Sequence, residues 1–122
     1  MELKHQEITS EIIRAAFEVF NILGYGFLEK VYQRSMQVEL IQRGLLAELE
    51  YPIQVKYKGT IVGDYAADLF VERKGIAELI VAREYQVQDE AQVLNELKAS
   101  GVEVGVLINF GREGVKVRRF IF

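Results

Sequence analysis

Apolar residues recur with a helical period in three stretches of the chain. From about Thr9 or Ser10 to Leu23 they repeat every three or four positions around a broad sector, which predicts a buried helix ending at Gly24. The same spacing predicts a second helix over about residues 27–43 and a third over about 88–100. Because Gly44 and Gly101 follow these two stretches directly, we expect both helices to end there.

Between and after these helices the pattern changes to strands. Residues 51–58 alternate apolar and polar, which predicts a strand with one buried face, and residues 61–62 are expected to pair back on it. Residues 64–71 and 76–82 predict two further short strands. Residues 102–110 are almost continuously apolar, which predicts a strand covered on both faces. Residues 115–122 form the last predicted strand, whose apolar ends a partner, or a second copy of the chain in a homodimer, would cover.

The two central strands bring two acids together. A three-residue loop with Gly75 in the left-handed conformation would set Asp68 opposite Ile80 and place Glu78 diagonally beside Asp68. Diagonal neighbours on one sheet face lie roughly 7–8 Å apart at the backbone, so their carboxylates can converge. Two such acids can hold a divalent cation, or they can be two separately solvated side chains.

The order of elements is helix, helix, three or four strands, helix, strand, strand. This order predicts one α/β domain (α+β, mixed) over residues 1–122, with a central mixed sheet flanked by helices. The absence of cysteine excludes disulfides and thiolate metal sites, and the single histidine, His5, lies too near the start to favour a serine–histidine–aspartate triad. No apolar run or signal-peptide pattern indicates a membrane span or export, so a cytoplasmic location is expected.

The net charge is also informative about partners. The chain carries a formal charge of −3, which counts against binding nucleic acid by overall charge. It does not exclude a local basic surface, because lysines and arginines occur in pairs along the predicted strands.

Several motifs, taken in order, resemble one known family. Residues 26–32 read G-x-x-E-x-x-Y and follow L-G-Y-G at the end of the first predicted helix. Downstream come Y-P-I-Q-V-K-Y-K-G, G-D-Y-A-A-D-L, A-E-L-I, A-Q-V-L-N-E-L-K-A-S-G and V-G-V-L-I-N-F-G. Together these segments, over about residues 8–119, resemble the GxxExxY proteins, a group assigned to the PD-(D/E)XK nuclease superfamily. The resemblance implies a restriction-endonuclease-like core.

The resemblance also implies a chemistry. In that superfamily an aspartate, and an acid two residues before a lysine, hold Mg²⁺, for which Mn²⁺ can substitute. The metal and the lysine activate a water molecule against a phosphodiester of nucleic acid. By position, the resemblance assigns catalytic roles to Glu29, Asp68, Glu78 and Gln92 and metal ligation to Asp68, Glu78 and Glu29, with Tyr32 as the companion of Glu29. Substrate binding is expected of Tyr32 and of Lys98, a lysine on the third predicted helix.

Three positions depart from the family pattern. Ile80 occupies the place of the lysine, Phe20 that of the usual histidine in the first helix, and Glu96 that of a tyrosine four residues after Gln92. Losing one preorganised electrostatic group typically lowers the rate by about 10²–10³. The cations considered as replacements for the lysine are Lys74, Arg83 and Lys98.

The sequence therefore leaves two main functions open. The first is a Mg²⁺-dependent nuclease whose activity is weak or lost because of Ile80. The alternative is a non-catalytic module on the nuclease fold that binds nucleic acid or another protein. A third reading is a small structural dimer with solvated acids. Whether the protein is an enzyme, which nucleic acid it would bind, its pathway and its oligomeric state are not given by the sequence.

Overall fold

The computed structural model describes residues 5–82 and 86–122 and confirms the predicted α/β class and order of elements. Two helices, α1 (Gln6–Leu23) and α2 (Glu29–Gln42), precede three strands, β1 (Ala47–Tyr57), β2 (Thr60–Val71) and β3 (Gly75–Ile80). Helix α3 (Val87–Ser100) and strands β4 (Val104–Gly111) and β5 (Gly114–Ile121) follow. None of the helices in the described ranges is long and apolar enough to cross a membrane.

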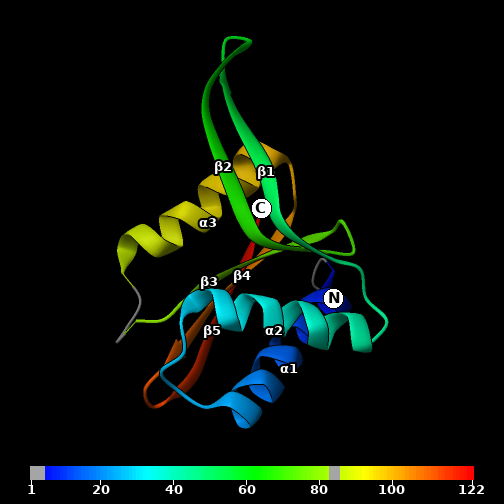
Figure 1. The fold of residues 1–122 in the computed structure, drawn as a ribbon. Coiled ribbons are helices and arrows are strands. Elements are labelled where there is room, and N and C mark those ends of the chain that lie inside the picture. The colour runs from blue at the N-terminus through cyan, green and yellow to red at the C-terminus, as the bar shows by residue number, and fades with distance from the viewer. Residues whose placement is uncertain (1–4, 83–85) are drawn as a thin grey trace.

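The five strands form one mixed sheet in sequence order, β1-β2-β3-β4-β5. All neighbours pair antiparallel except β3 and β4, which are parallel and are connected through α3. Helices α1 and α2 lie together on one side of the sheet, and α3 lies on the other (Figure 1). Strands β1 and β5 are the two edges of the sheet, and an edge strand can pair with a second chain. Dimerisation through β5 stays a prediction.

Each face of the sheet has its own core. Ile12 and Tyr32 of the first two helices pack with Leu69 and Ile108, whereas Val93 of α3 belongs to the second core. The residues packed with Val93 are Ile53, Ala67, Phe70, Ile76, Leu97, Leu107 and Phe120. Strand β4 is buried along its whole length, which confirms the prediction of a strand covered on both faces. Alternation along β3 then sends Ile76, and two residues later Glu78, toward the α3 side.

Some element boundaries differ from the sequence-based expectation. Strand β1 starts at Ala47 instead of residue 51, and β2 runs unbroken from Thr60, so together they form one long hairpin that projects from the body of the molecule (Figure 1). Gly63 is paired with Val55 inside this ladder, next to a shift in register between Val55 and Lys56, and the strand continues through it. Helix α1 starts at Gln6, before Thr9. The Thr9 hydroxyl therefore lies within the helix, where it donates to the carbonyl of Gln6 at 3.1 Å and does not act as a cap.

The predicted register of the central hairpin is wrong by two residues. The observed ladder pairs Leu69 with Ala77 and ends there. One further step in this register sets Asp68 directly opposite Glu78, where the sequence predicts a diagonal pair. The two acids are thus closer neighbours than the sequence predicted.

The β2–β3 turn explains the shift in register. Glu72 and Arg73 adopt the positive φ angles, 53° and 51°, whereas Gly75, predicted in that conformation, is the first residue of β3 and pairs with Val71. The Arg73 guanidinium donates to Glu48 at 2.9 and 3.0 Å and lies over the ring of Tyr51, 5.5 Å from its centroid. These contacts across to β1 hold the turn in a conformation that local sequence alone does not favour.

Candidate active site

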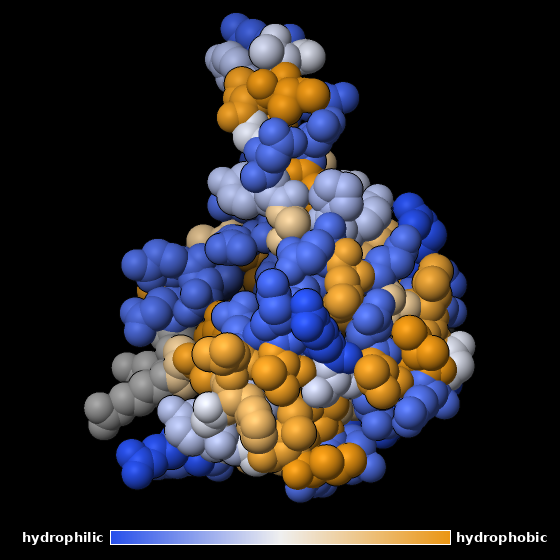
Figure 2. All heavy atoms as spheres, viewed as in Figure 1, coloured by the Kyte–Doolittle hydropathy of each residue, from blue (hydrophilic) through white to orange (hydrophobic). Residues whose placement is uncertain are grey.

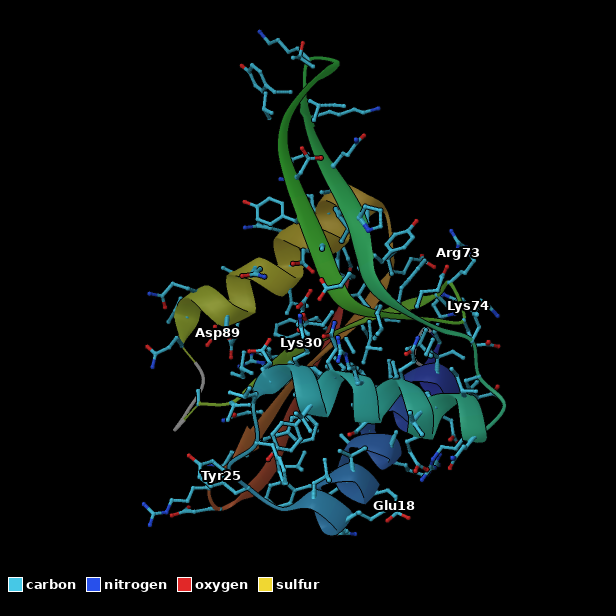
Figure 3. The ribbon with its side chains drawn as sticks, in the orientation of Figure 1. Glu18, Tyr25, Lys30, Arg73, Lys74 and Asp89 are labelled. Carbon is cyan, nitrogen blue, oxygen red and sulfur yellow. The ribbon has the colours of Figure 1, made fainter. Side chains whose placement is uncertain are left out.

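The candidate site lies where β2 and β3 separate. Beyond their short ladder, β2 continues along β1 into the projecting hairpin and β3 continues along β4. The N-terminal ends of α2 and α3, marked by Lys30 and Asp89 in Figure 3, flank this fork. A cavity of about 230 Å³ opens there, lined by Glu29, Ala66, Asp68, Glu78, Leu79, Ile80, Asp89, Gln92 and Leu107. We call it the acid cavity; the residues predicted to be catalytic, Glu29, Asp68, Glu78 and Gln92, all line it.

Asp68 is held in place by the strand across the fork. Its Oδ2 accepts the backbone N–H of Leu79 at 2.7 Å, so the carboxylate takes the donor that a longer β-ladder would pair with a carbonyl. Burial raises the pKa of Asp68, and hydrogen bonds from Glu78 and from the Leu79 N–H lower it only in part. The carboxylate is therefore well oriented, and no lysine or arginine of the described ranges lines the cavity beside it.

Glu78 is the most deeply buried acid of the cavity. Its side chain is 6% exposed, and its Oε1 has no hydrogen-bond partner; the same is true of Oε1 of Glu96, which is 2% exposed. Burial, followed by the neighbouring Glu96 and Asp68 carboxyls, raises the pKa of Glu78 far above its ordinary value. In the absence of a cation, Glu78 therefore carries a proton at neutral pH and can donate it in a hydrogen bond to a neighbouring carboxylate.

Glu29 is the first residue of α2 and lies at the rim of the acid cavity. Partial burial raises its pKa, and Asp68, Glu50 and Asp89 add to this rise by charge repulsion. The three residues that act on Glu29 come from β2, β1 and α3. This convergence shows that acids from four elements share one electrostatic environment.

Tyr32 does not line the acid cavity. It is fully buried, its ring stacks on Phe110 with centroids 4.3 Å apart, and its hydroxyl donates to the carbonyl of Gly24 at 2.5 Å. The same hydroxyl accepts the backbone N–H of Phe27 at 3.4 Å. Tyr32 thus fixes the loop that leads into Glu29, and the predicted role in substrate binding does not fit its burial.

Gln92 and Lys98 lie on the same helix but not in the same cavity. Gln92 Nε2 donates to Glu96 at 3.1 Å, and the Gln92 side chain lines both the acid cavity and a larger neighbouring cleft. Lys98 lines only the larger cleft. The predicted catalytic glutamine is therefore at the boundary between the two, and the predicted substrate-binding lysine is beyond it.

Ile80 stands at the lysine position and lines the acid cavity. Beside it, the Asn109 side chain makes two 3.0 Å hydrogen bonds with the backbone of Ala82 and so fixes the end of the strand. Among the described residues, no lysine or arginine lines the cavity. Lys74 lines a different cavity against α1, and Arg83, another candidate replacement, lies outside the described residues.

A supporting residue that is not among the predicted site residues is Gln33. It is buried, and its Nε2 donates to the backbone carbonyl of Asp68 at 2.9 Å and to Oε1 of Glu50 at 3.0 Å. Glu50 has a φ of 51° within β1, a strained conformation for a residue other than glycine. The available signal was helical spacing, because Gln33 lies four residues after Glu29 on the same face of α2.

Asp89 is a second missed residue. It lines the acid cavity, and its Oδ2 accepts the backbone N–H of Gln86 at 2.9 Å as part of the cap of α3. Its position three residues before Gln92 places both on one face of the helix, which was the signal in the sequence. Asp89 thus has an established structural role as well as a place in the cavity wall.

The side chains of the acid cavity fit a hard divalent cation chemically. Four carboxylates line it, and none of them pairs with a lysine, arginine or histidine of the described ranges. Within residues 5–82 and 86–122, no three histidine, cysteine or acidic side chains are grouped closely enough to hold a metal by themselves. Mg²⁺, however, is usually bound by one or two carboxylates with several waters. The arrangement fits a site built on Asp68 and Glu78, and Glu29 as a third ligand stays a prediction.

Comparison with known proteins agrees with this fold. The family model of the PD-(D/E)XK nuclease superfamily matches residues 6–120. The crystal structure of SSO0001 matches with a TM-score of 0.61 at 14% identity, covering 76% of this chain and 50% of that one. The crystal structure of an alkaline exonuclease (LHK-Exo) from Laribacter hongkongensis matches with a TM-score of 0.51 at 10% identity, covering 99% of this chain and 59% of that one.

These solved structures are related to the chain in fold. The chain spans only about half of the length of SSO0001 and less than two thirds of the exonuclease. No curated protein matches the sequence. The family match, in contrast, extends over nearly all of the chain and includes every residue of the acid cavity. The chain therefore belongs to the PD-(D/E)XK nuclease superfamily.

Proposed function

We propose that the protein is a slow, metal-dependent phosphodiesterase acting on nucleic acid, of the GxxExxY group within the superfamily. One observation carries the proposal: Asp68 and Glu78, on facing strands, line one small cavity together with Glu29 and Gln92. The buried Glu78 Oε1 has no hydrogen-bond partner within the protein, which suits an atom that ligates a cation.

The residues of the acid cavity would divide the work as follows. Asp68 and Glu78 would hold Mg²⁺ or Mn²⁺, which supplies charge neutralisation at the phosphate and a lowered pKa for bound water. The Leu79 N–H keeps the Asp68 carboxylate in one orientation, and Gln33 fixes the backbone behind it. Glu29, at the rim and with a raised pKa, is placed to accept a proton from attacking water.

Ile80 is the reason to expect slow hydrolysis. Its apolar side chain lines the cavity where the superfamily has a lysine, and no described cation replaces that charge. A missing electrostatic group of this kind typically lowers the rate by about 10²–10³. The same observation favours a second candidate function, in which the protein binds nucleic acid or another protein without cleaving a bond.

The test compares the wild type with Ile80→Lys and Asp68→Ala in cleavage of single- and double-stranded DNA and RNA with Mg²⁺ or Mn²⁺. We expect measurable wild-type cleavage, faster cleavage by Ile80→Lys by about 10²–10³, and none by Asp68→Ala. Cleavage by Ile80→Lys alone would establish the non-catalytic candidate. Absence of cleavage by both would overturn the proposed chemistry.

Melting temperatures provide a second readout that does not depend on turnover. Millimolar Mg²⁺ should raise the melting temperature of the wild type but not of Asp68→Ala, because a ligand that binds only the folded state stabilises it. Glu78 must lose its proton to become a ligand, so the increase should grow with pH. An increase of the same size in both proteins would place the metal elsewhere.

A further inference from the structure

A second and larger cleft lies between the β1–β2 hairpin and α3. Its volume is about 950 Å³, and we call it the hairpin cleft. The residues lining it are Gln54, Val55, Lys56, Tyr65, Gln88, Ala91, Gln92, Asn95, Glu96, Lys98 and Ala99. Because Gln92 lines both the hairpin cleft and the acid cavity, the two hollows adjoin at this side chain.

The hairpin cleft and the acid cavity have opposite charge. Lys56 and Lys98 are the exposed charged residues of the cleft, one from each wall, and its acid, Glu96, is buried. The acid cavity, in contrast, is lined by four carboxylates and by no described cation. On a chain with a net charge of −3, a cleft with exposed lysines on both walls is a local site for an anion.

The cleft also offers aromatic and amide groups. Tyr65, 52% exposed, lines it from the hairpin, and Tyr57, 63% exposed, lies further along β1 with Lys58 Nζ 5.4 Å from its ring centroid. Exposed tyrosine rings next to lysines are the combination on which single-stranded nucleic acid binds, with bases stacked on the rings and phosphates on the cations. In a duplex the base faces stack on one another and are not available to these rings.

The helices on the other side of the sheet present a different surface. In the space-filling view the exposed side of α3 is blue and polar, whereas orange apolar patches gather over α1 and α2 (Figure 2). The exposed apolar residues of those helices include Ile22, Val38 and Ile41. The polar, basic cleft is thus separate from the surface that would suit an apolar protein partner.

We propose that the hairpin cleft binds single-stranded nucleic acid and leads the strand past Gln92 to the acid cavity. This inference rests on the proposed function for the class of ligand and adds the path and the single-stranded form. Lys56 and Lys98 contact phosphates from the two walls, and Tyr65 stacks on a base between them.

The experiment is a fluorescence-anisotropy titration of labelled oligothymidylate, oligouridylate and a duplex of equal length, in EDTA so that nothing is cleaved. We expect tighter binding of the single strands than of the duplex. The double variant Lys56→Ala/Lys98→Ala should lower the slope of log affinity against log salt by about 1.4, since each phosphate contact on a single strand contributes about 0.7. Tyr65→Ala should weaken single-strand binding roughly 5- to 150-fold.

The matched control is Lys74→Ala/Lys116→Ala, which removes the same charge from exposed lysines at the β2–β3 turn and on β5. An equal loss in the control and in the Lys56/Lys98 variant would overturn the proposal, as would tighter binding of the duplex. Far-UV circular dichroism of each variant verifies that the loss is not one of folding.

If Asp68→Ala ends cleavage but the cleft variants bind normally, the proposed function stands and the path is wrong. Binding through the cleft without any cleavage would leave the path standing and reject the catalytic function.

Discussion

Glu78 is the residue at which the fold and the chemistry of the site conflict. It projects from β3 toward α3, where Glu96 comes from the helix and Asp68 from the facing strand. Ionising a buried carboxyl next to two others is unfavourable, because burial and charge repulsion both oppose the negative charge. Glu78 therefore keeps a proton where a cation would otherwise balance the charge. The site is thus unfavourable for the stability of the ligand-free protein, and binding a cation would remove that cost.

This conflict predicts how stability depends on pH. The folded state keeps a proton on Glu78 that the unfolded chain releases above the ordinary pKa of glutamate, so the free energy of unfolding should fall as pH rises from about 5 toward 8. Each extra proton held by the folded state contributes a fall of about 1.4 kcal/mol per pH unit. Glu78→Gln should flatten the curve by up to this slope, as measured by urea unfolding at a series of pH values.

The pKa values of Asp68 and Glu29 are also raised, so the free energy of unfolding of Glu78→Gln should still fall somewhat as pH rises. Glu113→Gln, at an exposed position in the β4–β5 turn, is the control and should leave the wild-type slope unchanged. Parallel curves for the wild type and Glu78→Gln would show that Glu78 is ionised in the folded protein.

At the scale of elements, packing between α3 and β4 sets the position of one wall of the site. A Cβ added to Gly105 would lie 2.9 Å from Val93 Cγ1 and 3.4 Å from the Leu97 methyl carbons. Both residues belong to the face of α3 that contacts the sheet, and Gln92 and Glu96 precede them by one residue each. The glycine therefore permits the close approach that brings the side chains of α3 to the acid cavity.

Gly105→Ala should consequently push α3 away from the sheet. Overpacking of a core typically costs about 1–3 kcal/mol of stability, and here the increase in melting temperature caused by Mg²⁺ should shrink as well. Gly59→Ala at the hairpin tip is the control: its φ of +85° makes alanine unfavourable, but a Cβ there meets nothing within 4 Å. It should lower stability and leave the effect of Mg²⁺ intact. An undiminished effect in Gly105→Ala would show that α3 adapts without moving the site.

The elements themselves could be predicted from periodicity, but their pairing could not. Burial of β4 and the ends of α2 and α3 follow from local apolar spacing and from glycines. The register of β2 and β3 depends on a turn whose positive φ angles at Glu72 and Arg73 are stabilised by contacts with β1. Such tertiary contacts are invisible in a local pattern, and so were the hydrogen bonds of Gln33.

For the candidate site, the motif spacing correctly identified the acids as neighbours. Side chains alternate between the two faces of a strand, so any shift in register by an even number of residues keeps each side chain on the same face. A shift of two residues preserves the face, so Asp68 and Glu78 still meet although the predicted pairing was wrong. Position along the chain did not reveal whether a side chain is exposed. The substrate-binding role predicted for Tyr32 came with its place beside Glu29 in the family motif, whereas its ring lies in the core.

At the scale of the whole molecule, the acid cavity and the hairpin cleft carry opposite charges. The acid cavity repels a phosphate, and the adjoining hairpin cleft attracts one. A strand in the cleft would therefore stop short of the acid cavity unless a cation neutralised the carboxylates there. The metal and the nucleic acid should in this way favour each other's binding.

This coupling gives a prediction opposite to the usual effect of Mg²⁺. Divalent cations ordinarily weaken binding to nucleic acid because they compete for the phosphates. Here Mg²⁺ should tighten the binding of a short single strand by about 5- to 150-fold, the usual range for coupled sites, when anisotropy is read before any turnover. In Asp68→Ala only the competitive weakening should remain. In Lys56→Ala/Lys98→Ala the affinity for the single strand should fall both with and without Mg²⁺, and the ratio of the two affinities should stay the same. By linkage, the oligonucleotide must raise the affinity for Mg²⁺ by the same factor, which calorimetry can measure independently. Equal weakening by Mg²⁺ in the wild type and in Asp68→Ala would show that the two hollows act separately, since a metal bound between carboxylates and phosphate cannot leave the affinity for the strand unchanged.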